Sequence, residues 1–85
     1  MRSAKELMDI FDELRKERTE AGEYAAASAW KSAESTINTH MHGKPNQIWA
    51  REAIASLKRK IEAEDDQARK DVWVEAIAII STQAL

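Results

Sequence analysis

Two pairs of carboxylates have a spacing that can bind a divalent metal ion. Glu20 and Glu23 lie three residues apart, as do Glu62 and Asp65, so on a continuous helix both members of a pair project from one side. Carboxylate oxygens are preferred ligands of Mg²⁺, and pairs on facing helices can share an ion. However, Gly22 can break a helix between the first two carboxylates, and acids are frequent, with 15 in 85 residues. We therefore expect solvated helix ends rather than a metal site.

The same pair spacing resembles the ExxE and ExxD pairs that surround magnesium in all-α nucleotide pyrophosphohydrolases. This resemblance implies a metal-dependent nucleotide hydrolase, which is our alternative function. No cluster of Lys, Arg or Asn has the spacing of a phosphate cradle. We accordingly predict no metal, no other cofactor and no catalytic residue.

Histidine and nucleophile chemistry find little support in the sequence. His40 and His42 are two residues apart, so on a helix they point about 200° away from each other and cannot share a metal ion. We expect them to complement the exposed carbonyls of a last helical turn before Gly43. The chain has no Cys, and no Ser is visibly paired with a His and an acid. The sequence thus favours a protein that is not an enzyme.

The basic run Lys58, Arg59 and Lys60 is a candidate patch for an acidic protein or a nucleic acid. Consecutive residues fan around a helix, so the three cations cannot form one stripe. Four acids follow directly, which favours local charge compensation. The formal charge of −2 and the pI near 5.7 also differ from a general nucleic-acid binder, whose affinity comes from phosphate neutralisation. A small nucleic-acid-associated regulator is kept as a second alternative.

Periodic apolar residues predict two helices in the first half of the chain. The first runs from Ser3 to Arg18, where Ser3 and Glu6 have the spacing of a capping box. A break near Gly22 separates it from an Ala-rich helix that extends from about residue 23 to residue 41.

Parts of these two segments resemble a tetratricopeptide helix pair, in which small residues permit tight packing. The resemblance covers less than half of the chain, and both the second aromatic and Pro45 fall outside the family's positions. It implies a helical hairpin here, and no family function is carried over. The residues that carry it are Phe11, Leu14, Gly22, Glu23, Tyr24, Ala27, Trp30 and Ala33.

Gly43 and Pro45 mark the clearest break in the sequence, because Gly readily adopts the left-handed conformation after a helix and Pro cannot continue one. We expect positive φ at Gly43 and Pro45 in the first turn of the next helix. The last forty residues contain neither Gly nor Pro. They can form one long helix or, as we favour, two helices separated near Glu64, Asp65 and Asp66.

The last segment, from Val72 to Ile80, differs from the others because only Glu75 is strongly polar. Its β-branched residues also suit a strand, but no second strand candidate exists, so we predict a helix. A helix that is apolar all round is buried all round. It can be central in the monomer or covered by a partner, and we favour a symmetric homodimer. The expected interface comprises Trp73, Val74, Ile77, Ile79 and Ile80.

The hydrophobic content of 44% includes fifteen Ala, so large core residues are few. Without disulfides, a chain of this size depends on well-packed helices, a partner or self-association. At least two of Trp30, Trp49 and Trp73 are expected to fill the core. The other predicted core residues are Leu7, Phe11, Leu14, Ile37, Ile54, Leu57 and Ile61.

Together these features predict one all-α domain over residues 1–85, a small bundle of three to four helices packed through a helical hairpin. No stretch approaches the roughly 20 apolar residues of a membrane span, and the first ten residues include acids. We therefore expect a cytoplasmic protein. The predicted function is a non-enzymatic protein-protein interaction module, a small adaptor, regulator or inhibitor whose partner is another protein or, preferably, a second copy of itself.

Overall fold

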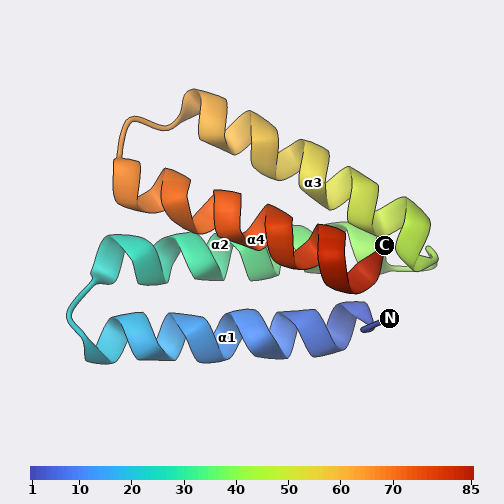
Figure 1. Cartoon of the computed structure of the whole chain (residues 1–85), viewed down its shortest axis with the longest axis horizontal. Helices are drawn as coiled ribbons and strands as arrows, with labels where there is room; N and C mark the ends of the chain where they lie inside the picture. Colours follow the sequence, from blue (N-terminus) through green and yellow to red (C-terminus); the bar gives the residue numbers. More distant parts are fainter.

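Four α-helices and no strand make up the computed structural model, which describes residues 1–85 (Figure 1). Helices α1 and α2 pack as one antiparallel hairpin, and α3 and α4 pack as a second. The all-α bundle, the first hairpin and the separation of the last forty residues into two helices are thereby confirmed. The helices are α1 (Ala4–Glu20), α2 (Tyr24–Met41), α3 (Asn46–Ala63) and α4 (Gln67–Ala84).

Side chains cap the starts of α1 and α4. The Glu6 backbone N–H donates to Ser3 Oγ at 3.2 Å, and the Ser3 N–H donates to Glu6 Oε1 at 2.9 Å, so the predicted capping box is confirmed. At α4, Asp66 Oδ1 accepts from the Arg69 N–H at 3.2 Å. Pro45 precedes the first turn of α3 instead of lying within it, and its carbonyl accepts from the backbone of that turn.

Both glycines have positive φ, for different reasons. At Gly22 (φ +76°) the Glu23 N–H donates to the Arg18 carbonyl at 2.9 Å. This is the Schellman arrangement that ends a helix. Helix α1 accordingly ends at Glu20, two residues beyond the predicted end at Arg18. At Gly43 (φ +70°) the Lys44 N–H donates to the Met41 carbonyl at 3.2 Å. With extended His42 before it, Gly43 is the third residue of a type II turn, which requires positive φ.

Replacement of Gly43 by Ala is expected to lower the free energy of unfolding by about 1 kcal/mol, because a Cβ disfavours the left-handed region. No atom lies within 4 Å of the Cβ that would be added, so backbone strain is the whole effect. Gly43→Asn should cost less, since Asn tolerates this region. Chemical denaturation of the three proteins tests the turn, and a neutral Gly43→Ala would contradict it.

Helix α2 occupies the centre of the bundle and packs against the other three helices. The side chains that it buries are mostly small, including Ala26, Ala29 and Ala33, and small residues let neighbouring helices approach closely. Of the predicted core residues, Leu7, Phe11, Ile37 and Leu57 are fully buried. The other three, Leu14, Ile54 and Ile61, are half-buried and pack against the core cluster.

All three Trp side chains are in the core. The indole N–H of Trp73 donates to the Ala29 carbonyl on α2, and that of Trp49 donates to Asn46 Oδ1, both at 3.0 Å. The indole N–H of Trp30 is buried without an acceptor, and its ring lies 5.1 Å from that of Phe11 between centroids. The indoles thus fill the core and also join α4 to α2.

Helix α4 does not occupy the centre of the bundle, so the alternative in which a central position buries its apolar segment is wrong, while burial by a partner stays a prediction. Helix α2 takes the central place, so α4 lies beside it and keeps one side open to solvent. Val74, in the middle of the segment, is 56% exposed. The small Ala side chains of α2 let α4 approach closely, but they cover only one side of it.

Candidate functional site

The open side of α4 carries large apolar side chains. Val74 and Ala78 are exposed, four residues apart and therefore on one side of the helix, while Ile77 and Ile79 flank them and are half-buried. We call these four residues the α4 ridge. Of the expected interface residues, Trp73 and Ile80 belong to the monomer's core, with 3% and 0% exposure. A partner can therefore reach only the ridge residues of the expected set.

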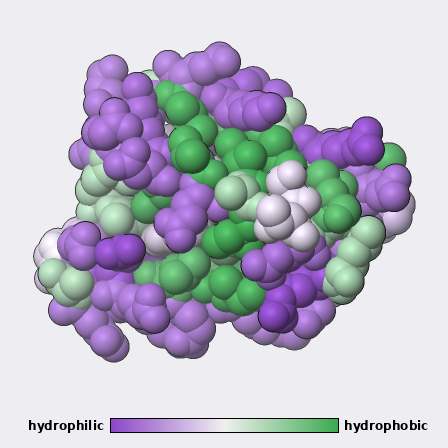
Figure 2. Space-filling view, viewed as in Figure 1, coloured by the Kyte–Doolittle hydropathy of each residue, from purple (hydrophilic) through white to green (hydrophobic).

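The α4 ridge lies on the face of the molecule that Figures 1 and 2 present to the viewer, where α3 lies above α4 and α1 below it, and α2 lies behind. Hydrophobic residues form a band across the middle of this face (Figure 2). Mostly hydrophilic residues lie above and below the band. An apolar band with polar margins is the arrangement found in protein-protein interfaces.

Three cations line the α3 margin of the ridge: Arg51, Lys58 and Lys70. On α3, Arg51, Ile54, Lys58 and Ile61 recur at helical spacing on one side. The opposite side of α3 faces α2, because Glu52 contacts His40 of α2 at 3.3 Å. None of the three cations makes an ion pair in the structure. We call them the basic strip.

The predicted basic run divides around α3. Lys58 is exposed and belongs to the basic strip, whereas Arg59 is exposed but turned about 100° away from it. Lys60 is half-buried on the side of α3 that faces α2. The three cations therefore form no common patch, as their consecutive positions predict.

Three acids line the opposite, α1 margin of the ridge: Glu17 of α1 and Asp71 and Glu75 of α4. All three are exposed, and none makes an ion pair. Asp71 accepts only a hydrogen bond from Gln67, at 2.8 Å. We call them the acidic strip. The ridge thus separates unpaired positive charge from unpaired negative charge.

A groove of about 220 Å³ opens between the start of α4 and the α1–α2 turn. Asp71 and Glu75 stand on its rim with the Arg18–Glu23 ion pair, and Trp30 contributes to its lining. Its volume is below the roughly 300 to 1,000 Å³ of typical small-molecule sites. We therefore treat the groove as part of the acidic strip.

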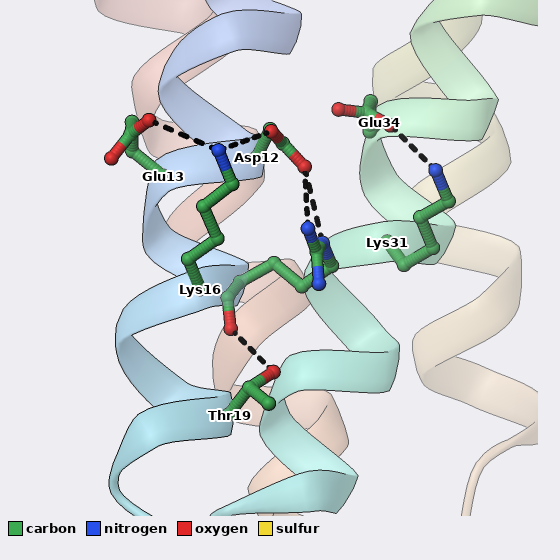
Figure 3. Close-up of polar contacts among 7 residues, drawn as sticks. Asp12, Glu13, Lys16, Thr19, Lys31 and Glu34 are labelled. Carbon is green, nitrogen blue, oxygen red and sulfur yellow. Dashed lines mark hydrogen bonds and ion pairs between the residues drawn. The ribbon is translucent and has the colours of Figure 1, made fainter.

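Several charges on α1 and α2, by contrast, are paired within the chain. Figure 3 shows Lys16 between Asp12 and Glu13, with nitrogen-oxygen distances of 3.4 and 3.6 Å, and Lys31 paired with Glu34 at 3.0 Å. The Arg15 guanidinium, 2.9 Å from Asp12, lowers the pKa of that carboxyl, and Asp12 in turn raises the pKa of Lys16. The charges of the two strips beside the ridge lack such partners.

Arg69 fixes the link between α3 and α4, a role that no pattern in the sequence indicates. Its Nε donates to Glu64 at 2.7 Å, its Nη1 donates to Ser28 of α2 at 3.0 Å, and its guanidinium lies 5.1 Å from the centre of the Trp73 ring. The contact with Ser28 spans 41 residues. It holds the start of α4, which carries Lys70, Asp71 and Glu75, against α2.

The Arg69 hydrogen bond lowers the pKa of Glu64 below its ordinary value of 4.5. A carboxylate with a lowered pKa stabilises the folded state above its unfolded pKa, and this contribution disappears as the pH falls through the folded pKa. The free energy of unfolding should therefore be level near neutral pH and decrease below about pH 4.5.

Glu64→Gln should remove part of this acid dependence and lower the stability at pH 7 slightly. Glu62→Gln, which removes a nearby carboxylate without an ion pair, should keep the slope of the wild type. Urea titrations between pH 3 and pH 7 measure the slopes. Equal slopes for Glu64→Gln and the wild type would contradict the assigned role of the Arg69–Glu64 pair.

The other candidate chemistry is dispersed. Glu20 and Glu23 flank the α1–α2 turn, and Glu62 and Asp65 flank the end of α3, all exposed. His40 and Lys44 both contact Glu52, Lys44 at 2.6 Å, and Lys44 is the main cause of the lowered pKa of Glu52. No group of three or more His, Cys, Asp or Glu side chains is arranged to hold a metal ion.

Comparisons with known proteins give no relative from which a function could be transferred. No family model matches the chain, and no curated protein or solved structure is significantly similar to it. None of the four helices combines the length and apolar composition that a membrane crossing requires.

Proposed function

We propose that this chain is a non-enzymatic protein-interaction module that presents the α4 ridge to another protein surface. The observation that carries the proposal is that Val74, an apolar residue in the middle of an apolar helix segment, is 56% exposed. Burial of apolar surface is the main favourable term in most protein association. The adjacent Ala78, Ile77 and Ile79 extend this surface along two turns of helix.

A module of this kind acts as a small adaptor, regulator or inhibitor, and we propose that it works in the cytoplasm, as expected from the sequence. The core anchors the ridge from behind through Trp73 and Ile80, which are buried directly beneath it. Such a preformed surface binds without the entropic cost of ordering a loop.

Site-specific photo-crosslinking in cells that naturally express the protein tests the proposal. A photoreactive side chain at Val74 should yield a crosslinked protein adduct. The same group at Arg59, exposed on a different side of the neighbouring helix α3, is the matched control and should yield none. Absence of an adduct at position 74, or equal adducts at both positions, would contradict a specific interaction through the ridge.

A further inference from the structure

We propose that the partner of the α4 ridge is a second copy of this chain, related by a twofold axis parallel to α4. This inference rests on the proposed function, since it assumes that the ridge is an interface. It adds the identity of the partner and the relative orientation of the two copies. The two charged strips beside the ridge carry the argument.

Both strips lack partners in the monomer, although most other surface charges are paired. The basic strip (Arg51, Lys58 and Lys70) and the acidic strip (Glu17, Asp71 and Glu75) carry equal and opposite formal charge. A protein with only an acidic surface would match the basic strip and be repelled by the acidic one. A second copy offers both signs, so it can match both strips together.

The positions of the charges along α4 select the orientation. Lys70, Asp71 and Glu75 lie in the first three turns of α4, and Lys58 lies within two turns of the α3–α4 link. The α1–α2 turn, near Glu17, is at this same end of the bundle (Figure 1). Lys58 and Lys70 therefore lie at heights similar to those of the acids on the opposite margin, whereas Arg51, in the second turn of α3, lies toward the other end of the bundle.

A 180° rotation about an axis parallel to α4 leaves the position of each charge along the helix unchanged. It places the α3 margin of one copy opposite the α1 margin of the other. Lys58 and Lys70 of each copy then face the acidic strip of the other, and the two ridges meet between them. A twofold axis perpendicular to α4, in the plane of the interface, would instead place the basic strip of one copy against the basic strip of the other, which is repulsive. The arrangement we infer is therefore a dimer in which the two α4 helices run parallel.

In this dimer the ridge supplies the apolar contact and the strips supply specificity and orientation. The affinity should fall as salt is added, because exposed charges are screened over about 8 Å at physiological ionic strength. A dimer held by the ridge alone would show little salt dependence.

Charge reversal with complementation tests the inference. One variant, Lys58→Glu with Lys70→Glu, makes both margins acidic, and the other, Asp71→Lys with Glu75→Lys, makes both margins basic. Each variant alone should dimerise at least tenfold more weakly than the wild type in analytical ultracentrifugation. An equimolar mixture should recover the affinity of the wild type as a heterodimer. Arg59→Glu and Asp65→Lys, which reverse unpaired charges away from the ridge, should dimerise like the wild type.

Circular dichroism verifies that the variants are folded, and Lys58→Glu alone replaces the first variant if half-buried Lys70 does not tolerate Glu. Unchanged dimerisation of the reversed variants, or a mixture no stronger than its components, would overturn the orientation and its charge matching. A monomeric wild type at every concentration would overturn the second copy as partner. The proposed function fails separately, when position 74 gives no specific adduct in cells.

Discussion

Replacement of Phe11 by Ala is expected to lower the free energy of unfolding by about 3 to 5 kcal/mol, the usual cost of deleting a buried aromatic side chain. Phe11 is fully buried on α1, and its ring lies 5.1 Å from the Trp30 ring at a tilt of 52°. The substitution removes this aromatic pair and leaves a cavity between α1 and central α2. Because domains of this size are stabilised by roughly 4 to 13 kcal/mol, the variant should be close to unfolding.

Thermal and urea denaturation of Phe11→Ala and Tyr24→Ala provide the measurement and its control. Tyr24 is 69% exposed, so its truncation should change stability by no more than about 0.5 kcal/mol. A Phe11→Ala protein that melts like the wild type would show that α1 does not pack on α2 through this side.

Enlargement of Ala33 to Leu should destabilise the protein by about 1 to 3 kcal/mol, through overpacking. Ala33 is fully buried in α2, the helix that packs against all three others. Three added carbons must therefore displace a neighbouring helix or force side chains out of their preferred rotamers.

Ala55→Leu is the matched control, because Ala55 lies on the exposed side of α3 and its enlargement should be neutral within about 0.5 kcal/mol. Denaturation curves for both variants distinguish the two environments. Tolerance of Leu at position 33 would contradict the close approach of the helices at α2.

Local signals in the sequence were sufficient to predict the helix boundaries to within about two residues. Ser3 with Glu6, Gly43, and the acids before Arg69 each act on backbone groups within a few residues. Their effects therefore do not depend on how the helices pack. The same holds for Phe11 and Leu57, which stand among polar neighbours and so identify the buried side of their helices.

The sequence does not predict which helix packs against which, or which side of α4 is exposed. Both predictions would need a helix with one polar and one apolar side, and α2 and α4 lack that difference. Helix α4 has apolar residues on every side, so the periodicity of the sequence could not separate buried Trp73 and Ile80 from exposed Val74. Helix α2 contains many Ala residues. They indicate that other helices pack closely against it, but they do not identify which helices these are. The contact of Arg69 with Ser28 joins segments 41 residues apart, and no local pattern specifies it.

The burial of the ridge residues decides which variant tests the interface. Ile77 and Ile79 pack against the core cluster, so a Glu at either position would disturb the fold as well as an interface. Val74 is 56% exposed, and a Glu there can remain hydrated in the monomer. Val74→Glu therefore separates association from folding.

The mass of the protein in solution at micromolar concentration, measured by light scattering after size exclusion, tests most directly whether copies of this chain associate through the α4 ridge. The account predicts a mass of two chains for the wild type and of one chain for Val74→Glu, with equal helicity by circular dichroism. A wild type with the mass of one chain, or a two-chain mass that persists in Val74→Glu, would contradict it.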